Sequence, residues 1–164
     1  MSKTPIKIFR TDNGPCPYLE KRNWQNISFH TSKIQPDSYT SLLNQGFRRS
    51  GLTIYHPVCS SCQECIPIRI DVHNFFKNKG QRRTWRKNND LRVEHHINEF
   101  NQEDFTLYSR YQSEWHKTEV PVKESEYLDF LIDSPVPTEI LRYYLGGKLI
   151  GLGWVDRLPD LLSS

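Results

Sequence analysis

The stretch Glu139-Ile140-Leu141-Arg142-Tyr143-Tyr144-Leu145, followed by Gly146-Gly147 and a second apolar run over residues 148–156, decides the fold. Two β-forming segments joined by two residues predict an antiparallel hairpin. Glycine suits both turn positions because it adopts positive φ angles without a steric cost. We therefore expect a β-hairpin near the end of the chain.

Helical periodicity precedes this hairpin. Phe105, Tyr108, Tyr111 and Trp115 recur at steps of three or four residues, which is the spacing of one helix face. Asn101 stands before them in the position of an N-cap. The pattern predicts a helix whose aromatic stripe packs in the core.

Shorter elements complete the predicted fold. Residues 125–132 predict a short helix that ends before Pro135, because the residue before proline avoids helical geometry. Residues 67–72 and 91–97 alternate apolar and polar side chains, which predicts two half-buried strands. His95 falls in the apolar phase of the second strand and is expected to pack in the core. Together with short strands and loops in the N-terminal third, these elements predict an α/β (α+β) fold.

The composition is that of a soluble, folded protein. The chain has 164 residues, of which 25% are charged and 12% are aromatic, and this aromatic content argues against disorder. The first ten residues contain no apolar run of signal-peptide length, and no later segment is apolar for long enough to span a bilayer. We expect a cytoplasmic protein that does not associate with membranes.

Four cysteines suggest a metal site. Cys59, Cys62 and Cys65 form a Cys-x-x-Cys-x-x-Cys run, and Cys16 supplies a distant fourth thiol. Because cytosolic thiols stay reduced, this spacing favours a metal over disulfides. Zinc and an iron–sulfur cluster both accept such spacing. The alternative is that the four side chains are small buried apolar groups in a metal-free core.

Positive charge is concentrated in one segment. Between Lys77 and Arg92, seven basic residues stand against Asp90 alone, so this segment carries +6 whereas the whole chain carries +3. Such a patch points to a polyanionic partner, and Trp85 adds a side chain on which a base can stack. The residues expected to bind nucleic acid are Lys77, Lys79, Arg82, Arg83, Arg86 and Lys87. The alternative is a solvated loop without a ligand.

Several motifs occur along the chain in a fixed order. They are Gly46-Phe47-Arg48-Arg49-Ser50-Gly51 leading into residues 55–69, Gln81-Arg82-Arg83, Tyr108-x-x-Tyr111-x-x-x-Trp115-His116 and Val155-Asp156-x-Leu158-Pro159-Asp160. This ordered set resembles the bacterial branch of the arginyl/leucyl-tRNA–protein transferase family. The resemblance covers nearly the whole chain.

The resemblance implies an architecture and an activity. It implies an N-terminal cysteine-bearing region, residues 1–72, followed by part of a GNAT-like acyltransferase domain, residues 73–164. The implied donor is leucyl-tRNA, and the implied acceptors are proteins that begin with Asp or Glu and become degradation substrates of the N-end rule pathway. An arginyl-tRNA donor is the alternative. Family members continue beyond the last residue here, so we expect a C-terminally truncated member whose activity on its own is in doubt.

Four residues are expected to act on the reactants. Aminolysis of an ester is undemanding, because an α-amino group with a pKa of about 7.7–8.0 is already partly neutral, and positioning then supplies most of the acceleration. No cofactor is required. His116 and Asp156 are expected to handle protons or to orient the amine, whereas Arg48 and Arg49 are expected to bind the acceptor carboxylate in bidentate fashion. Their structural alternatives are a helix-end histidine, a strand-end aspartate and two solvated arginines.

Two other functions compete with this interpretation. A non-catalytic, metal-stabilised RNA-binding module would use the cysteines and the basic segment, but it leaves the hairpin and residues 155–164 without a purpose. An acetyltransferase that uses coenzyme A would need a glycine-rich pyrophosphate loop after its central strands, and this sequence has none.

Overall fold

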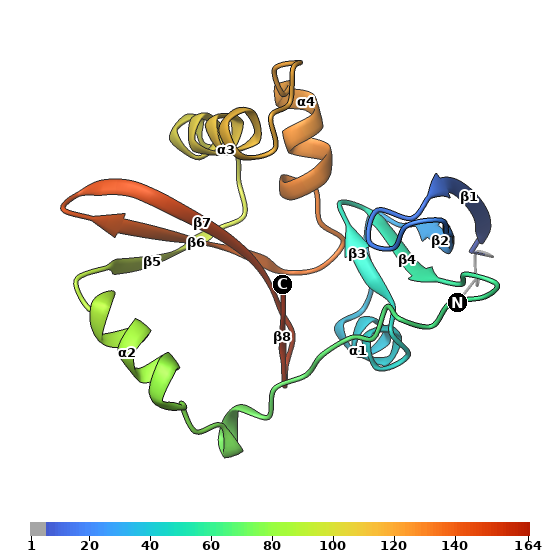
Figure 1. Ribbon diagram of the computed structural model, residues 1–164, viewed down its shortest axis with the longest axis horizontal. Helices are drawn as coiled ribbons and strands as arrows, with labels where there is room; N and C mark the ends of the chain where they lie inside the picture. Colours follow the sequence, from blue (N-terminus) through green and yellow to red (C-terminus); the bar gives the residue numbers. More distant parts are fainter. Residues whose placement is uncertain (1–5) are drawn as a thin grey trace. The chain divides into compact units, whose positions relative to one another are not determined.

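The computed structural model describes residues 6–164, apart from the side chains of Asp12 and Asn13, and it divides into two compact units. The first unit comprises the described chain through Pro67, Leu128–Pro137 and Leu158–Leu161; the second comprises Ile68–Tyr127, Thr138–Arg157 and Leu162–Ser164. Each unit is built on its own four-stranded antiparallel sheet (Figure 1). Across these residues, no helix combines the length and apolar character that crossing a membrane requires.

The sheet of the first unit is assembled from four antiparallel strands. In sheet order these are β1 (Phe9–Pro15), β2 (Asn23–His30), β4 (Thr53–Pro57) and β3 (Arg48–Ser50). Its core contains Phe29, Tyr39, Ile54, Val136 and Leu158, none of them more than 7% exposed. Two of these five residues come from late segments of the chain, so the unit is discontinuous in sequence.

A helix that the sequence analysis missed, α1 (Pro36–Asn44), covers this core. Pro36 occupies the first turn, where its missing N–H costs nothing, and Asp37 adds an acid beside the positive helix end. Tyr39 is 1% exposed and Leu42 and Leu43 pack against the same core. The expectation of strands and loops alone in the N-terminal third was therefore wrong.

The second unit confirms the predicted hairpin. Its strands, in sheet order, are β5 (Arg92–Ile97), β6 (Thr138–Leu145), β7 (Lys148–Arg157) and β8 (Leu162–Ser163). Gly146 and Gly147 have φ angles of 57° and 82°, so the two-residue turn needs the positive-φ freedom that the sequence supplies. β5 confirms the strand predicted over residues 91–97.

The predicted long helix is confirmed as α3 (Gln102–Trp115). The Asn101 side chain caps it by accepting hydrogen bonds from the backbone N–H groups of Glu103 and Asp104. The aromatic stripe enters the core only in its first half, because Tyr111 and Trp115 are 48% and 73% exposed. The core assignment of the whole stripe was wrong.

The short predicted helix is also present, as α4 (Glu124–Tyr127) continued by a π-helical turn, η2 (Leu128–Ile132). Tyr127 at the end of α4 is fully buried. Its ring contacts four other aromatic rings, with centroid distances of 5.2–6.2 Å, from Phe100, Phe105, Tyr108 and Trp154.

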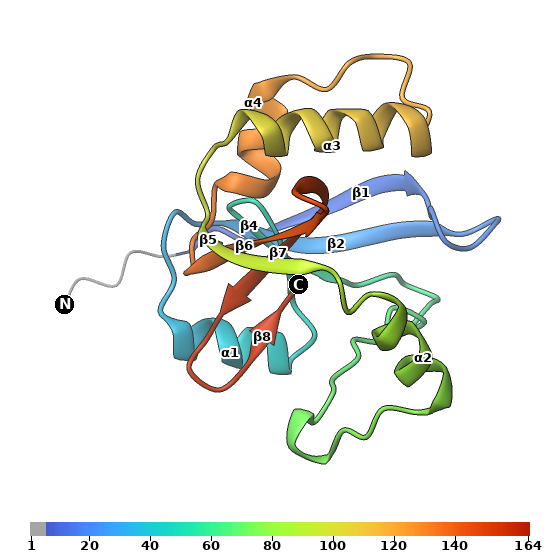
Figure 2. The ribbon, with the colours of Figure 1, turned by 90° about the vertical axis from the view of Figure 1, so that its left-hand side faces the viewer.

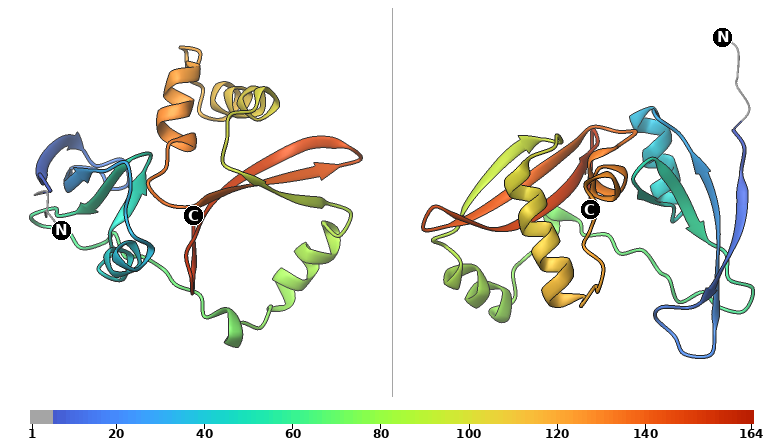
Figure 3. Two further views of the ribbon diagram at one scale, coloured as in Figure 1. Left: turned by 180° about the vertical axis from the view of Figure 1, so that it is seen from behind. Right: turned by 90° about the horizontal axis from the view of Figure 1, so that it is seen from above.

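α3 and α4 lie on one side of the β5–β8 sheet, and α2 (Lys79–Lys87) lies on the other (Figures 1 and 2, and the left view of Figure 3). We name the side toward α3 the covered face; it carries Ile140, Arg142, Trp154 and Asp156. The opposite side carries His95 and Glu139, and we name it the open face, since every residue of α2 is exposed and none packs against it.

The strand predicted over residues 67–72 does not form. Within residues 6–164 no strand pairs with this segment, which ends in a 3₁₀ turn, η1 (Val72–Asn74). Ile68 and Ile70 are 88% and 64% exposed. Alternation of apolar side chains signals a half-buried strand only where a sheet edge is there to pair with it. The mixed α/β arrangement expected from the sequence is otherwise confirmed.

Candidate functional site

The basic segment forms a well-capped helix instead of a loop. The Asn78 side chain accepts a hydrogen bond from the Gln81 N–H at 2.9 Å, and the Gln81 side chain accepts one from the Asn78 N–H at 2.9 Å. This reciprocal capping box satisfies two otherwise unpaired donors at the start of α2. At the other end, Arg86 and Lys87 lie in the last turn, where positive charge is favourable.

The cations of α2 share one side of the helix. At 3.6 residues per turn, each residue is rotated by about 100° from the one before it, so the five basic residues fall within an arc of about 140°. They are Lys79, Arg82, Arg83, Arg86 and Lys87. Gly80, Gln81, Thr84 and Trp85 occupy the rest of the circumference. Helical geometry thus converts a basic run into a one-sided basic surface.

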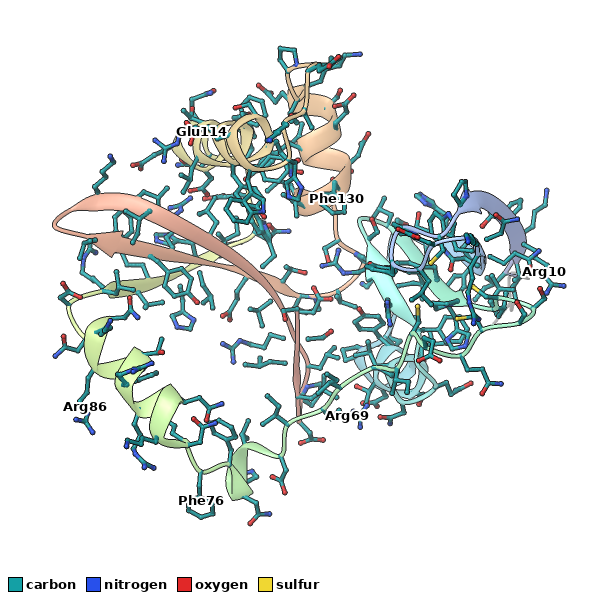
Figure 4. All side chains as sticks on the ribbon, viewed as in Figure 1. Arg10, Arg69, Phe76, Arg86, Glu114 and Phe130 are labelled. Carbon is teal, nitrogen blue, oxygen red and sulfur yellow. The ribbon has the colours of Figure 1, made fainter. Side chains whose placement is uncertain are left out.

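This surface is fully accessible. Every residue of α2 is exposed, and Figure 4 shows the Arg86 side chain pointing away from the helix. Lys77 stands just before the helix with its Nζ 4.5 Å from the centroid of the Trp85 ring, and its carbonyl accepts a hydrogen bond from Arg82 Nη1 at 2.5 Å. Lys77 therefore contacts both Trp85 and Arg82 of the helix. The residues predicted to bind nucleic acid thus lie together on α2 and just before it.

The Gly46–Gly51 motif forms the start of a tight hairpin. Gly46 and Gly51 both have positive φ, at 85° and 54°. A Cβ at Gly51 would lie 2.0 Å from the backbone oxygen of Asp129, and one at Gly46 would lie 3.1 Å from His56 Cε1. Both glycines are therefore required by conformation and by close approach, and they bracket the short strand β3.

The two arginines of this motif lie on opposite faces of the first sheet, because neighbouring residues of a strand alternate. Arg49 pairs across the strands with the core residue Ile54 and donates to the Gly51 carbonyl at 3.2 Å. Arg48 pairs with Tyr55 on the other face and donates through Nη2 to the Cys65 carbonyl at 3.2 Å. The structure therefore does not present the two guanidinium groups to one ligand side by side.

The four cysteines are free and half-buried. The backbone N–H of Cys62 donates to the Cys59 carbonyl at 3.4 Å, and Cys59 Sγ accepts from the Gln25 N–H at 3.4 Å. Among residues 6–164, no three side chains of the ligand-forming types converge as a metal site would require. A metal on Cys16, Cys59, Cys62 and Cys65 therefore stays a prediction.

The two predicted proton-handling residues occupy different surroundings. His116 is exposed and caps the C-terminal end of α3, with its Nε2 3.2 Å from the hydroxyl of Tyr111. Asp156 is buried on β7 and accepts a hydrogen bond from Thr138 Oγ1 at 2.8 Å. Each position agrees with the structural alternative as well as with the catalytic one.

Sequence reasoning missed a buried ion pair on the covered face. Arg142 donates from Nε and Nη2 to both carboxylate oxygens of Asp104, at 2.9–3.1 Å, and Asp104 is fully buried. Burial, reinforced by the Asp104 carboxylate, raises the pKa of the neighbouring Tyr127 hydroxyl above its usual range. A signal was present, since Asp104 lies on the helix face of Tyr108 and Arg142 lies in the phase of Ile140.

A second cluster on the open face was also missed. Glu139 lies between His95 and Arg157, which come from the strands on either side of it. The His95 side chain is 61% exposed, so its assignment to the core was wrong. The apolar phase of β5 faces away from α3, and its side chains remain in solvent.

Comparison with known proteins identifies the chain's relatives. The sequence model for "Arginine-tRNA-protein transferase, N terminus" matches residues 14–83, and the one for "Arginine-tRNA-protein transferase, C terminus" matches residues 103–164. The chain belongs to this transferase family. The two matches together span more than half of the sequence, and they leave out the start of the chain and residues 84–102, which contain the whole of β5.

Within the transferase family, several relatives share a name. An aspartate/glutamate leucyltransferase of Saccharophagus degradans is 37% identical over 97% of this chain and 69% of its own length. Those of Hahella chejuensis and Shewanella putrefaciens are 35% and 36% identical, over 97% and 99% of this chain. They are covered over 69% and 70% of their own lengths.

Proposed function

We propose that this transferase conjugates leucine from leucyl-tRNA to the N-terminus of proteins that begin with Asp or Glu, marking them for degradation by the N-end rule pathway. The observation that carries the proposal is the similarity, over 97% of this chain, to relatives named aspartate/glutamate leucyltransferase. The one-sided basic surface of α2 supports the tRNA part of the proposal, because phosphate binding needs accessible cations.

The reaction forms one bond and breaks one. The α-amine of the acceptor attacks the carbonyl carbon of the aminoacyl ester, and a C–N bond forms as the C–O bond to the tRNA ribose breaks. The amine loses a proton and the ribose oxygen gains one, so no cofactor is needed. The assignment of residues 73–164 to part of a GNAT-like acyltransferase domain and a cytoplasmic location belong to the same proposal.

Of the two motif arginines, Arg48 is the better candidate for the acceptor carboxylate. It lies on the sheet face away from the core, whereas Arg49 shares the face of Ile54. An arginine fork binds a carboxylate through two parallel hydrogen bonds. Arg49 then serves the hairpin through the Gly51 carbonyl.

The tRNA contact is tested by charge removal with a matched control. The variant Arg82→Ala, Arg83→Ala, Arg86→Ala removes three cations from the basic arc of α2, and the control removes three exposed lysines elsewhere, Lys33, Lys123 and Lys148. We expect the first variant alone to weaken leucyl-tRNA binding and to lower the slope of log affinity against log salt by roughly two to three. Equal behaviour of the two variants would assign the arc to solvent.

The acceptor assignment is tested by transfer to a peptide that begins with Asp. Arg48→Ala should lower transfer by about tenfold or more, since a charge-assisted contact contributes roughly 1.5–3 kcal/mol, and leucyl-tRNA binding should hardly change. Arg48→Lys should restore only part of the rate, because an ammonium keeps the charge without the fork. Parallel loss of transfer and tRNA binding would remove Arg48 from the acceptor site. Specificity for the acceptor is tested with a peptide that begins with a neutral residue, which should receive little leucine. Specificity for the donor is tested with arginyl-tRNA in place of leucyl-tRNA.

A further inference from the structure

Three polar side chains form a row across the open face of the second sheet. His95 on β5, Glu139 on β6 and Arg157 on β7 lie on adjacent strands. Glu139 pairs with Ile97 on one side and with Val155 on the other, so His95 and Arg157 are its diagonal neighbours, each two residues along its own strand. Diagonal neighbours on one face are within reach of long side chains.

Glu139 is held from both sides. Arg157 binds it through two donors, Nε to Oε1 and Nη2 to Oε2, the second at 2.8 Å. His95 Nδ1 lies 3.2 Å from Oε2 of the same carboxylate. The bidentate contact fixes the plane of the carboxylate, and the carboxylate in turn fixes the ring of His95.

The other ring nitrogen of His95 is available. Among the residues that the structure describes, Nε2 of His95 has no hydrogen-bond partner, and the side chain is 61% exposed. A carboxylate that accepts from Nδ1–H selects the tautomer whose Nε2 carries a lone pair. An oriented histidine with a free Nε2 is the arrangement of a general base.

The neighbours of His95 along its own strand leave this nitrogen accessible. Val93 and Ile97 on β5 are 44% and 78% exposed, whereas the Tyr143 side chain covers the neighbouring Gly153 of β7. The basic helix α2 lies on this same side of the sheet, in the same compact unit (Figures 1 and 2). His116 and Asp156, by contrast, are carried by the helix on the covered side and by the covered face.

We propose that His95 is a catalytic residue of the transfer reaction and that Glu139 is its positioning residue, an inference that rests on the proposed function. When the acceptor amine adds to the ester carbonyl, the nitrogen of the tetrahedral intermediate carries a surplus proton. His95 Nε2 takes this proton and returns it to the ribose oxygen as the C–O bond breaks. The histidine ends in its starting state, so atoms and charges balance without a further reactant.

Arg157 keeps Glu139 in its charged form and in a fixed orientation. Its two donors hold Glu139 as a carboxylate, so the proton taken by His95 is not lost to Glu139. Among the described residues of β5, β6 and β7, Tyr143 on β6 is a further titratable side chain of this face, and the structure places it over Gly151 and Gly153. Tyr143 is therefore the neighbour that has to be controlled for in a pH profile.

The experiment measures steady-state transfer of leucine to an Asp-peptide by the whole protein across a pH series. His95→Gln keeps a hydrogen-bond donor for Glu139 but cannot carry a proton, and we expect kcat to fall on the order of a hundredfold with KM little changed. The acid limb of the profile should disappear, and added imidazole should restore part of the rate to His95→Ala. Glu139→Gln should lower kcat less and shift the acid limb, whereas Glu139→Asp should recover part of the rate.

Controls separate the possible results. His30→Gln, at an exposed histidine of the first unit, should behave as wild type, and equal melting temperatures should exclude misfolding of the His95 variants. Tyr143→Phe should leave the acid limb in place. Active wild type together with an unchanged rate and profile in His95→Gln would overturn this inference alone. Wild-type protein that binds leucyl-tRNA but transfers nothing would overturn the proposed function and this inference with it.

Discussion

Two arginine–carboxylate pairs with almost the same geometry lie on opposite faces of the second sheet. Arg142 and Asp104 on the covered face have side chains that are 12% and 0% exposed, whereas Arg157 and Glu139 on the open face are 51% and 28% exposed. Both arginines bind with two donors. The same contact can therefore serve two purposes, and solvent access decides which.

On the covered face the ion pair between Arg142 and Asp104 is required for stability. Removing either charge leaves the other buried without a counter-ion, and such a loss costs more than the intact pair contributes. On the open face water replaces either partner at little cost, so the row is a weak source of stability. The row on the open face has a defined geometry although it contributes little to stability, and we therefore attribute that geometry to a role in the reaction.

The largest expected effect is on the covered face. Asp104→Ala leaves Arg142 unpaired and should lower the free energy of unfolding by about 3–5 kcal/mol, measured by urea denaturation. Glu103→Ala is the matched control, because it removes an exposed acid from the same helix turn and should change stability by less than about 0.5 kcal/mol. Similar losses of stability in both variants would show that Asp104 stabilises the protein through the dipole of α3 and not through its ion pair with Arg142.

A second prediction compares one substitution on the two faces. Ile140→Ala, at a fully buried residue of the covered face, should cost about 2–5 kcal/mol through lost burial and a residual cavity. Ile97→Ala on the open face removes the same atoms from a residue that is 78% exposed, and should stay within about 0.5 kcal/mol. A large loss at Ile97 would mean that the open face is covered in the folded protein.

The smallest expected effect is the pH response of the open row. Hydrogen bonds from Arg157 and then from His95 lower the pKa of Glu139 from 4.5 to about 2. Because the folded pKa is the lower one, the stabilising contribution is fully present above about pH 4.5 and is lost as the pH falls toward about 2.

This response is measured by following the Glu139 side-chain carbon by NMR during an acid titration. Salt should weaken the shift, since the group is exposed. Arg157→Gln should move the titration back up, whereas Lys148→Gln, which alters an exposed cation at the far end of β7, should not. A Glu139 titration midpoint near pH 4.5 in the wild-type protein would show that Arg157 and His95 do not bind Glu139 in solution.

The parts of the fold that the sequence predicts are those with local signals. Gly146-Gly147 determines its own turn, and Asn101 caps α3 through contacts within three residues. These signals need no knowledge of the rest of the molecule. The strand expected over residues 67–72 failed because pairing depends on a neighbour that no local pattern reveals. α1 was missed because its capping signals include Pro36, which also marks turns.

The candidate site divides in the same way. The basic residues of α2 were predictable because charge is additive along a segment, although only the helix aligns them on one side. The row of His95, Glu139 and Arg157 joins residues up to 62 positions apart, and its members looked ordinary one at a time. The face on which His95 lies depends on which side α3 covers, and strand alternation alone does not contain that choice.

The discontinuity of the first unit has a consequence for synthesis. Its core includes Val136 and Leu158, so the strands made first cannot complete their core until the chain has been made almost to its last described residue. At about 5–20 residues per second, the ribosome needs roughly 5–20 s to travel from Pro67 to Leu161. During that interval the early sheet waits, partly exposed, while the chain of the second unit is made. Chaperone dependence during translation is the expected cost of this late closure.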